Sequence, residues 1–171
     1  RKKTVRENLA LALPHLSDAE RLDIEKKSYQ HLCDMFMEMI KTMTMSSTEM
    51  DKRFVLTNLE VVKDYEKKGK STILLASHYA SWEWLLTLNA KTSFRGIAVY
   101  KKIANKYFDK LVRDIRSKYK SELVVTNKSI QLMAKNQEEG ILCMYGLASD
   151  QSPKLNRAFH WDTFMGIEVP V

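Results

Sequence analysis

The chain has 171 residues, of which 44% are hydrophobic and 29% are charged. This balance is that of a globular protein with a hydrophobic core, and it argues against intrinsic disorder. The formal net charge of +7 predicts an anionic partner. A nucleic acid, an acidic membrane surface and an acidic carrier protein all satisfy that requirement, so charge alone excludes none of them.

The cysteines and the hydropathy limit the cellular setting. Cys33 and Cys143 lie far apart and belong to no Cys-x-x-Cys pair, so both are predicted to be reduced core residues of a protein facing the cytosol. No apolar run reaches the roughly 18 residues of a membrane span, and no signal peptide is visible. The chain opens without an initiator methionine and closes on a strand-like run, residues 167–171. We therefore expect a fragment truncated at its C-terminus, with any membrane anchor before Arg1.

Residues 1–66 are predicted to form a helical arm. Ser17 followed by Glu20 is a capping box at the start of a long helix. Beyond it, apolar residues at three-and-four spacing predict one buried helix face: Leu32, Met35, Phe36, Met39, Ile40 and Met43. Six methionines fall within residues 35–50, and flexible thioethers also suit a surface for acyl chains or lipid. The periodicity favours the core interpretation.

From Gly69 onward, short apolar runs alternate with helical stretches, which is typical of a parallel sheet with crossover helices. We predict strands at residues 71–77, 95–100, 122–126 and 140–147, helices at 81–92, 104–119 and 127–138, and a strand or hairpin near 159–171. The predicted fold class is α/β, with a mostly parallel or mixed sheet flanked by helices. One domain would cover residues 1–171, with a helical arm at 1–66 and an α/β core at 67–171.

His78 and Glu83 lie five positions apart just after the first predicted strand. In one continuous helix, that spacing would place their side chains about 140° apart. A base and its carboxylate partner can meet here only if the chain breaks between them. We therefore predict a strand ending near Ser77, a turn, and a helix whose N-cap is Ser81 and whose first turn holds Glu83.

Polar residues follow two further predicted strands. Lys101 and Lys102 come after residues 95–100, and Asp150 comes after residues 140–147. Parallel sheets bind ligands at the carboxyl ends of their strands, so these residues and His78 are predicted to share one edge. A turn aspartate considered alone is most often a simple cap.

The segment from Lys101 to Lys120 holds eight basic residues against two acids. On its predicted helix, one side is apolar and the other is basic: Phe108, Leu111, Val112 and Ile115 point inward, and Lys106, Lys110 and Arg113 point outward. A solvated face and a docking surface for phosphate or an acidic protein both remain open interpretations.

The segment around His78, SHYASWEW, resembles the H-x-x-x-x-E signature of the lipid A biosynthesis acyltransferase family, the late lauroyl and myristoyl transferases. The likeness extends along the chain in consistent order through VRENLALALPHLSDAE, AVYKKIANKYFDKLVRDIR, ASDQSP and WDTFMG. Ordered blocks are far more specific than one short motif. The resemblance implies a lysophospholipid acyltransferase-like fold.

The resemblance also implies roles for individual residues. His78 would be the catalytic base and Glu83 its essential carboxylate partner. Lys101 stands where the family usually has an arginine, which keeps the cation but loses the bidentate fork. The expected substrate-binding residues are Lys101, Lys102, Asp150 and Gln151, of which the last two match the family's Asp-Gln element.

The implied reaction moves a fatty acyl chain from a thioester, on acyl carrier protein or coenzyme A, to a hydroxyl of a lipid A precursor or related membrane glycolipid. Direct transfer is expected, with no acyl-enzyme and no cofactor beyond the thioester co-substrate. No metal site is predicted, because His78 and Glu83 lack further histidine or cysteine ligands. The expected location is the membrane surface at the cytoplasmic face of the bacterial inner membrane.

Two alternatives are weighed against this interpretation. A basic module that binds nucleic acid or an anionic membrane without catalysis would use the clustered Lys and Arg, but no RNP or zinc-finger motif accompanies them, so no nucleic-acid partner is predicted. An esterase-like hydrolase would need a G-x-S-x-G elbow, which the sequence lacks. Its five glycines are also too dispersed for a Rossmann loop or a P-loop.

Overall fold

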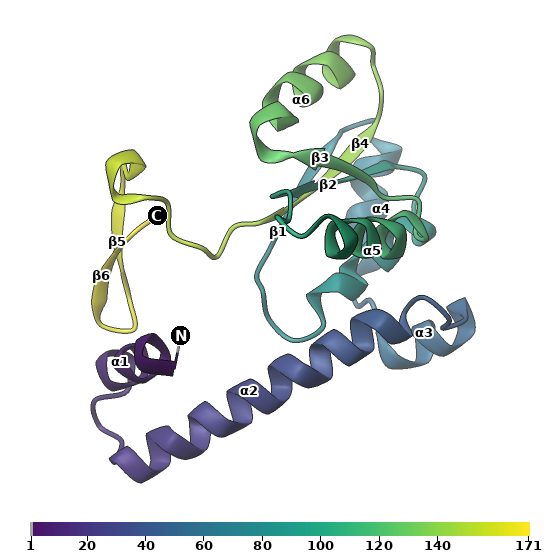
Figure 1. Cartoon of the computed structure of the whole chain (residues 1–171). Helices are drawn as coiled ribbons and strands as arrows, with labels where there is room; N and C mark the ends of the chain where they lie inside the picture. The colour runs from purple at the N-terminus through teal and green to yellow at the C-terminus, as the bar shows by residue number, and fades with distance from the viewer. Residues whose placement is uncertain (1) are drawn as a thin grey trace. The chain divides into compact units, whose positions relative to one another are not determined.

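The computed structural model describes residues 2–171 as two compact units. One unit comprises residues 2–37 and 151–171, and the other comprises residues 38–150. The predicted helices of the N-terminal segment are present as α1–α4, and the boundary between the two units falls inside α2 (Asp18–Lys41). Figure 1 labels the elements along the chain.

The first unit contains α1 (Lys2–Ala12), the start of α2, the short 3₁₀ helix η3 (Leu155–Arg157) and a hairpin of β5 (Trp161–Phe164) and β6 (Ile167–Pro170). The hairpin confirms the strand pair predicted near residues 159–171. The capping box is also confirmed, because the Ser17 N–H donates to Glu20 Oε2 at 2.8 Å and the Glu20 N–H donates to Ser17 Oγ at 3.3 Å.

The second unit is built on a four-stranded sheet in the order β1-β4-β2-β3, and every neighbouring pair is parallel. Its strands are β1 (Thr72–Ala76), β2 (Arg95–Tyr100), β3 (Glu122–Val125) and β4 (Cys143–Ala148). They lie where the sequence predicts strands, and the α/β fold class is confirmed. All four strands therefore end at the same edge of the sheet.

Helices cover both faces of this sheet (Figure 1). The remaining elements of the unit are α3 (Ser47–Arg53), α4 (Leu59–Lys67), α5 (Lys106–Ser117), α6 (Ser129–Glu138) and the 3₁₀ helices η1 (Trp82–Lys91) and η2 (Thr126–Lys128). Leu132 of α6 packs against Ile97 and Cys143 on one face. On the other face, Val62 of α4 packs with Met144.

Strand β1 is an edge strand, since within the described residues it pairs with β4 alone. Its side chains alternate, and Ile73 and Leu75 are 60% and 68% exposed. Both lie in register with β4 residues of the face that α6 packs against. The helix layer on that face is therefore incomplete over β1.

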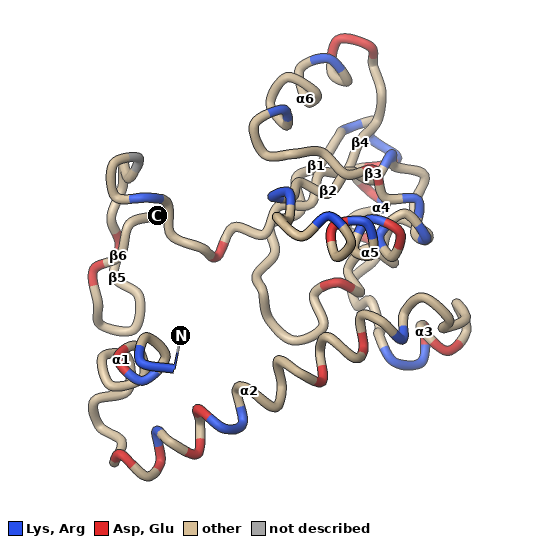
Figure 2. Tube along the Cα trace, viewed as in Figure 1, with Lys and Arg blue, Asp and Glu red and all other residues tan. Residues whose placement is uncertain are grey.

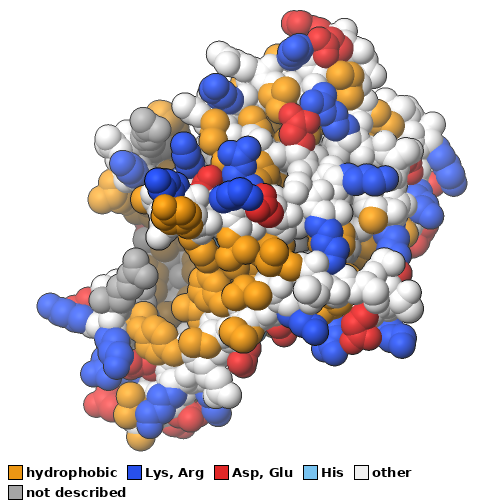
Figure 3. Space-filling model, turned by 45° about the vertical axis from the view of Figure 1, so that its right-hand side comes forward, with side chains coloured by type: hydrophobic (Ala, Val, Ile, Leu, Met, Phe, Trp, Pro, Cys, Tyr) orange, Lys and Arg blue, Asp and Glu red, His pale blue; other side chains and the backbone are white. Residues whose placement is uncertain are grey.

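The predicted buried face of the long helix is only partly buried. Met39 packs with Val112 and Ile115 of α5, and Met35 is buried too. The other members of the stripe are 42–46% exposed: Leu32, Phe36, Ile40 and Met43. The prediction was wrong for these four residues, because periodicity shows which residues share an apolar helix face but not how much of that face other elements cover. Figure 3 shows hydrophobic side chains gathered on the face that it displays.

The two cysteines differ. Cys143 is fully buried in the sheet core as predicted, whereas Cys33 is exposed on α2, so the core prediction was wrong for Cys33. No helix within residues 2–171 has the length and apolarity needed to cross a bilayer.

Replacement of Gly96 with alanine is expected to destabilise the second unit by about 1–3 kcal/mol, because the added methyl group overpacks the site. A Cβ at Gly96 in β2 would lie 2.0 Å from Nδ2 of Asn89, and that amide donates to Ser121 Oγ at 2.6 Å. The free energy of unfolding in urea measures the effect. Gly146→Ala in β4 is the control, since the nearest atom to its Cβ is Ile97 O at 3.9 Å. Equal losses in the two variants would contradict the steric explanation.

Candidate functional site

His78 and Asp150 meet at the carboxyl edge of the sheet. His78 follows β1 and Asp150 follows β4, its parallel neighbour, and a bond from Ser149 N–H to Ala76 O at 2.9 Å continues their pairing past the last register positions. The His78 main-chain N–H donates to Asp150 Oδ2 at 2.7 Å. Ring atom Nδ1 lies 2.7 Å from Oδ1 of the same carboxylate. One carboxylate thus fixes both the backbone and the ring of His78.

The negative charge on Asp150 determines which ring nitrogen of His78 carries the proton. The hydrogen bond from the His78 ring, reinforced by the His78 N–H, lowers the pKa of the Asp150 carboxyl below its ordinary value. An ionised carboxylate only accepts hydrogen bonds, so Nδ1 carries the proton and Nε2 keeps a free lone pair when the ring is neutral. The side chains of His78 and Asp150 are 36% and 34% exposed, which leaves the ring accessible. The Trp82 ring packs edge-on against the imidazole, with 5.0 Å between centroids.

Glu83 has a different partner from the one expected. Its carboxylate accepts two bonds from Arg116 of α5, at 2.9 Å from Nε and 2.5 Å from Nη2. This bidentate pair is mostly buried, with Glu83 and Arg116 side chains 11% and 18% exposed. The expected contact between His78 and Glu83 is therefore replaced by two separate pairs. The chain bends over residues 78–81, with Ala80 at φ 48°, and η1 begins only at Trp82, so Trp82 lies against the imidazole while Glu83 reaches α5.

The prediction that Ser81 is the N-cap of an α-helix was also wrong. The segment after it is a 3₁₀ helix rather than an α-helix, and the Ser81 side chain makes no capping bond. Its hydroxyl donates instead to the carboxylate of Glu38 on α2. Nearby, Trp84 Nε1 donates to Thr42 Oγ1 at 2.9 Å. The end of α2 thus holds the segment that follows His78.

Lys118 strengthens the same junction. Its ammonium group donates to the carbonyl oxygens of Thr42 and Met45, at 2.7 Å in each case, and to Met43 at 3.2 Å. These carbonyls lie at and just beyond the end of α2, where backbone acceptors lack helical partners and a cation is favourable. Sequence reasoning missed Glu38, Thr42 and Arg116, because nothing in the local pattern links them to residues 81–84.

The other predicted site residues lie as follows. Lys101 and Lys102 are exposed and come directly after β2, the strand next to β4, at the edge that carries Asp150. Gln151 is exposed and begins the C-terminal part of the other unit. The structure therefore brings His78 and Asp150 into contact and places the two lysines at the end of the adjoining strand.

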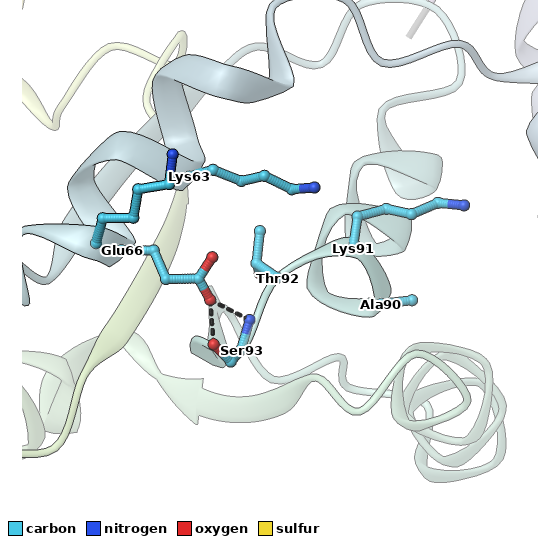
Figure 4. Close-up of a pocket in the computed structure, with 7 residues that line it drawn as sticks. Lys63, Glu66, Ala90, Lys91, Thr92 and Ser93 are labelled. Carbon is cyan, nitrogen blue, oxygen red and sulfur yellow. Dashed lines mark hydrogen bonds between the residues drawn. The ribbon is translucent and has the colours of Figure 1, made fainter.

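A hollow of about 490 Å³ lies at the opposite edge of the sheet (Figure 4). Lys63, Glu66 and Lys67 of α4 line it together with residues 90–93, which precede β2. The Glu66 carboxylate accepts bonds from the N–H and hydroxyl of Ser93, and these bonds lower the Glu66 pKa. This hollow is at the amino ends of the strands, away from His78, so it is not the candidate site.

The stability difference between the wild type and Asp150→Asn is expected to depend on pH in acid. The folded-state pKa of Asp150 is lowered, so its stabilising effect is complete above the unfolded value of about 3.9 and is lost as pH falls through the lower folded value. Urea unfolding between about pH 3 and pH 7 should show a constant difference above about pH 5 that shrinks below pH 4. A difference that grows on acidification would contradict the sign.

Glu83→Gln is expected to cost about 1–3 kcal/mol of unfolding free energy, because it leaves the guanidinium of Arg116 largely buried without its counter-charge. Arg116→Gln should cost a similar amount, and the double variant less than the sum of the two. Glu122→Gln is the matched control. The side chains of Glu122 and Arg95 are 43% and 39% exposed, so their ion pair should contribute under about 1 kcal/mol. Additive losses at residues 83 and 116 would show that they do not stabilise the fold as a pair.

Residues 1–160 match the family model described as bacterial lipid A biosynthesis acyltransferase. Comparison with curated proteins gives no match. The family match covers both the helices at the N-terminus and the sheet edge that holds His78 and Asp150, and the family resemblance of the sequence is confirmed. The chain therefore belongs to the bacterial lipid A biosynthesis acyltransferase family and is an acyltransferase of that pathway.

Proposed function

We propose that this acyltransferase moves a fatty acyl chain from a thioester, on acyl carrier protein or coenzyme A, to a hydroxyl of a lipid A precursor or related membrane glycolipid, with His78 as the general base. The observation that carries the proposal is the pair of hydrogen bonds that His78 makes, through its main-chain N–H and its ring Nδ1, to the Asp150 carboxylate. It fixes the ring proton on Nδ1 and leaves Nε2 as an accessible proton acceptor.

The reaction follows from that geometry. Nε2 of His78 removes the proton of the acceptor hydroxyl while the hydroxyl oxygen attacks the thioester carbonyl carbon. The tetrahedral intermediate then collapses, the C–S bond breaks, and the imidazolium returns the proton to the leaving sulfur. The ionised Asp150 stabilises the imidazolium without taking its proton. The products are an ester and a free thiol, so no oxidant or further reactant is required.

In this proposal Glu83 acts as a positioning residue. Its pair with Arg116 ties the start of η1 to α5, and Ser81 and Trp84 tie the same segment to α2. These contacts hold Trp82 against the imidazole and limit how far His78 can move. Loss of the Glu83 carboxylate would therefore act on the site indirectly, through the placement of η1.

The remaining predicted residues are proposed to contact substrate. Lys101 and Lys102 place two cations at the carboxyl edge, where they suit an oxyanion or a phosphate group. Gln151 is an exposed amide that directly follows Asp150 in the sequence. We place the reaction at the cytoplasmic face of the bacterial inner membrane, where an acyl thioester and a membrane glycolipid meet.

The test is a transfer assay on the full chain, with acyl carrier protein and coenzyme A thioesters offered separately against lipid A precursors and other membrane glycolipids. Transfer to a glycolipid hydroxyl that depends on His78 and Asp150 supports the proposal. Hydrolysis of the thioester alone would show that water, not a lipid alcohol, is the acceptor. An absence of transfer from either donor by the folded protein would overturn it.

A further inference from the structure

The ring of Trp82 contacts the imidazole of His78 on a side that Asp150 leaves open. The two rings pack edge-on, with their planes inclined by 67° and their centroids 5.0 Å apart. Asp150 holds only the Nδ1 edge of the ring and the main-chain N–H of His78. The side chains at both ends of the ring bond are partly exposed, so water competes for it. The hydrogen bond alone therefore does not restrict the imidazole to one rotamer.

Trp82 is held in place by contacts that do not involve the imidazole. The residue before it, Ser81, donates its hydroxyl to Glu38 of α2. The residue after it, Glu83, accepts two bonds from Arg116 of α5. Both helices carry acidic and basic positions, as Figure 2 shows. The backbone on each side of Trp82 is thus tied to a separate helix, and the indole forms a fixed surface against which the imidazole rests.

A left-handed residue turns the chain between the two rings. Ala80 has φ 48°, a backbone conformation that is unfavourable for a residue with a Cβ. Its side chain is exposed, so packing of its methyl group does not offset that cost. Such strain persists only where the surrounding structure fixes it, and it is concentrated at functional sites. The turn returns residue 82 to residue 78, so the contact between the two rings depends on it.

We propose that Trp82 is a positioning residue, which keeps the His78 ring on Asp150 and so keeps the proton on Nδ1 and the lone pair on Nε2. This inference rests on the proposed function, in which His78 is the base. Without the indole, the imidazole would turn away from Asp150 in part of the molecules, and the proton of the neutral ring would then also occupy Nε2. Turnover falls with the fraction of molecules that keep the competent arrangement.

The first experiment compares Trp82→Ala with Trp82→Phe in the full chain, with the thioester and the glycolipid that the wild type uses. In Trp82→Ala, kcat should fall about tenfold while the KM values for both substrates stay within about twofold, because only the competent fraction changes. Trp82→Phe keeps a flat aromatic ring, so its kcat should be within about threefold of the wild-type value. Urea unfolding curves on the same samples show whether each variant is folded.

A spectroscopic measurement separates positioning from a general effect on the fold. In protein labelled with ¹⁵N-histidine, two-bond ¹H–¹⁵N correlations show which ring nitrogen carries the proton. His78→Ala identifies the signals of His78 among those of the four histidines. In the pH range in which the ring is neutral, the wild type and Trp82→Phe should carry the proton on Nδ1, and Trp82→Ala should show both tautomers.

Ala80 offers a matched pair of variants that leave the indole in place. Ala80→Gly permits φ 48° without steric cost and removes no packed side chain, so it should keep the wild-type kcat and tautomer. Ala80→Val places a β-branched residue in the left-handed region, so the turn should open and the two rings should separate. Ala80→Val should therefore reproduce the losses of Trp82→Ala, and it carries the test if Trp82→Ala does not fold.

A folded Trp82→Ala variant with wild-type kcat, or with a lowered kcat and the proton still on Nδ1, would overturn the inference. Equal losses in Trp82→Phe and Trp82→Ala, or in Ala80→Gly and Ala80→Val, would overturn it too. The proposed function is judged separately by His78→Ala. If His78→Ala is inactive while Trp82→Ala is normal, the base stands and only the positioning inference fails. If His78→Ala keeps wild-type turnover, the proposed function fails and the positioning inference fails with it.

Discussion

His78→Ala is expected to lower kcat for acyl transfer by about 100- to 10,000-fold, with a smaller change in KM. Removal of a positioned general base typically costs this much, because an alcohol is a poor nucleophile until its proton is taken. Fold stability should change little, since the His78 side chain is 36% exposed and belongs to none of the core clusters. Initial rates at saturating donor and acceptor, measured with an unfolding curve for the same sample, check both expectations.

Lys70→Ala is a suitable control for His78→Ala, because it is an exposed side chain before the amino end of the same strand. It should retain wild-type kcat. A fully folded His78→Ala variant with near wild-type turnover would rule out the base that we propose. If this variant lost turnover only because it had unfolded, its urea midpoint would fall along with the rate.

Asp150→Asn is expected to have the second largest effect, also a loss of about 100-fold or more in kcat. The neutral amide cannot stabilise the imidazolium, and its N–H₂ group can donate to Nδ1, which would place the ring proton on Nε2, the wrong atom for a base. The two bonds that Asp150 makes to His78 give this prediction its basis. The rate should be compared with that of Glu83→Gln at a temperature at which both variants are folded.

The comparison separates the two carboxylates. Asp150→Asn should lose turnover without a matching loss of stability, whereas Glu83→Gln should lose stability first and turnover less. Arg116→Lys tests the positioning role further, because it keeps the charge and loses the bidentate fork that Glu83 accepts. The reverse result, with Glu83→Gln nearly inactive at full stability and Asp150→Asn nearly normal, would contradict the assignment of partners.

The sequence was sufficient for the sheet and for the edge that carries the site. Apolar runs with period-two alternation or full burial mark strands directly, and alternation with helices implies parallel pairing. Given a parallel sheet, residues that follow strands must gather at one edge, which is why His78, Lys101 and Asp150 could be placed together in advance. That argument needs no side-chain detail.

The choice of partner for each charged group could not be predicted in this way. Arg116 lies 33 residues beyond Glu83, and Glu38 lies 43 residues before Ser81. Such pairs depend on how α2, α5 and η1 pack, and local spacing contains no information on that packing. The H-x-x-x-x-E spacing suggested a direct contact because its two ends are close in sequence. The bend over residues 78–81, just before η1, instead lets the two side chains reach different partners.

Strand β1 has a consequence for handling the protein. It combines a free hydrogen-bonding edge, within the described residues, with two exposed aliphatic side chains, and such strands invite the addition of a strand from another molecule. The purified polypeptide should therefore self-associate as its concentration rises. Because His78 follows this strand, pairing of copies through β1 would obstruct the imidazole that we propose as the base, so specific activity should decline in concentrated samples and recover on dilution.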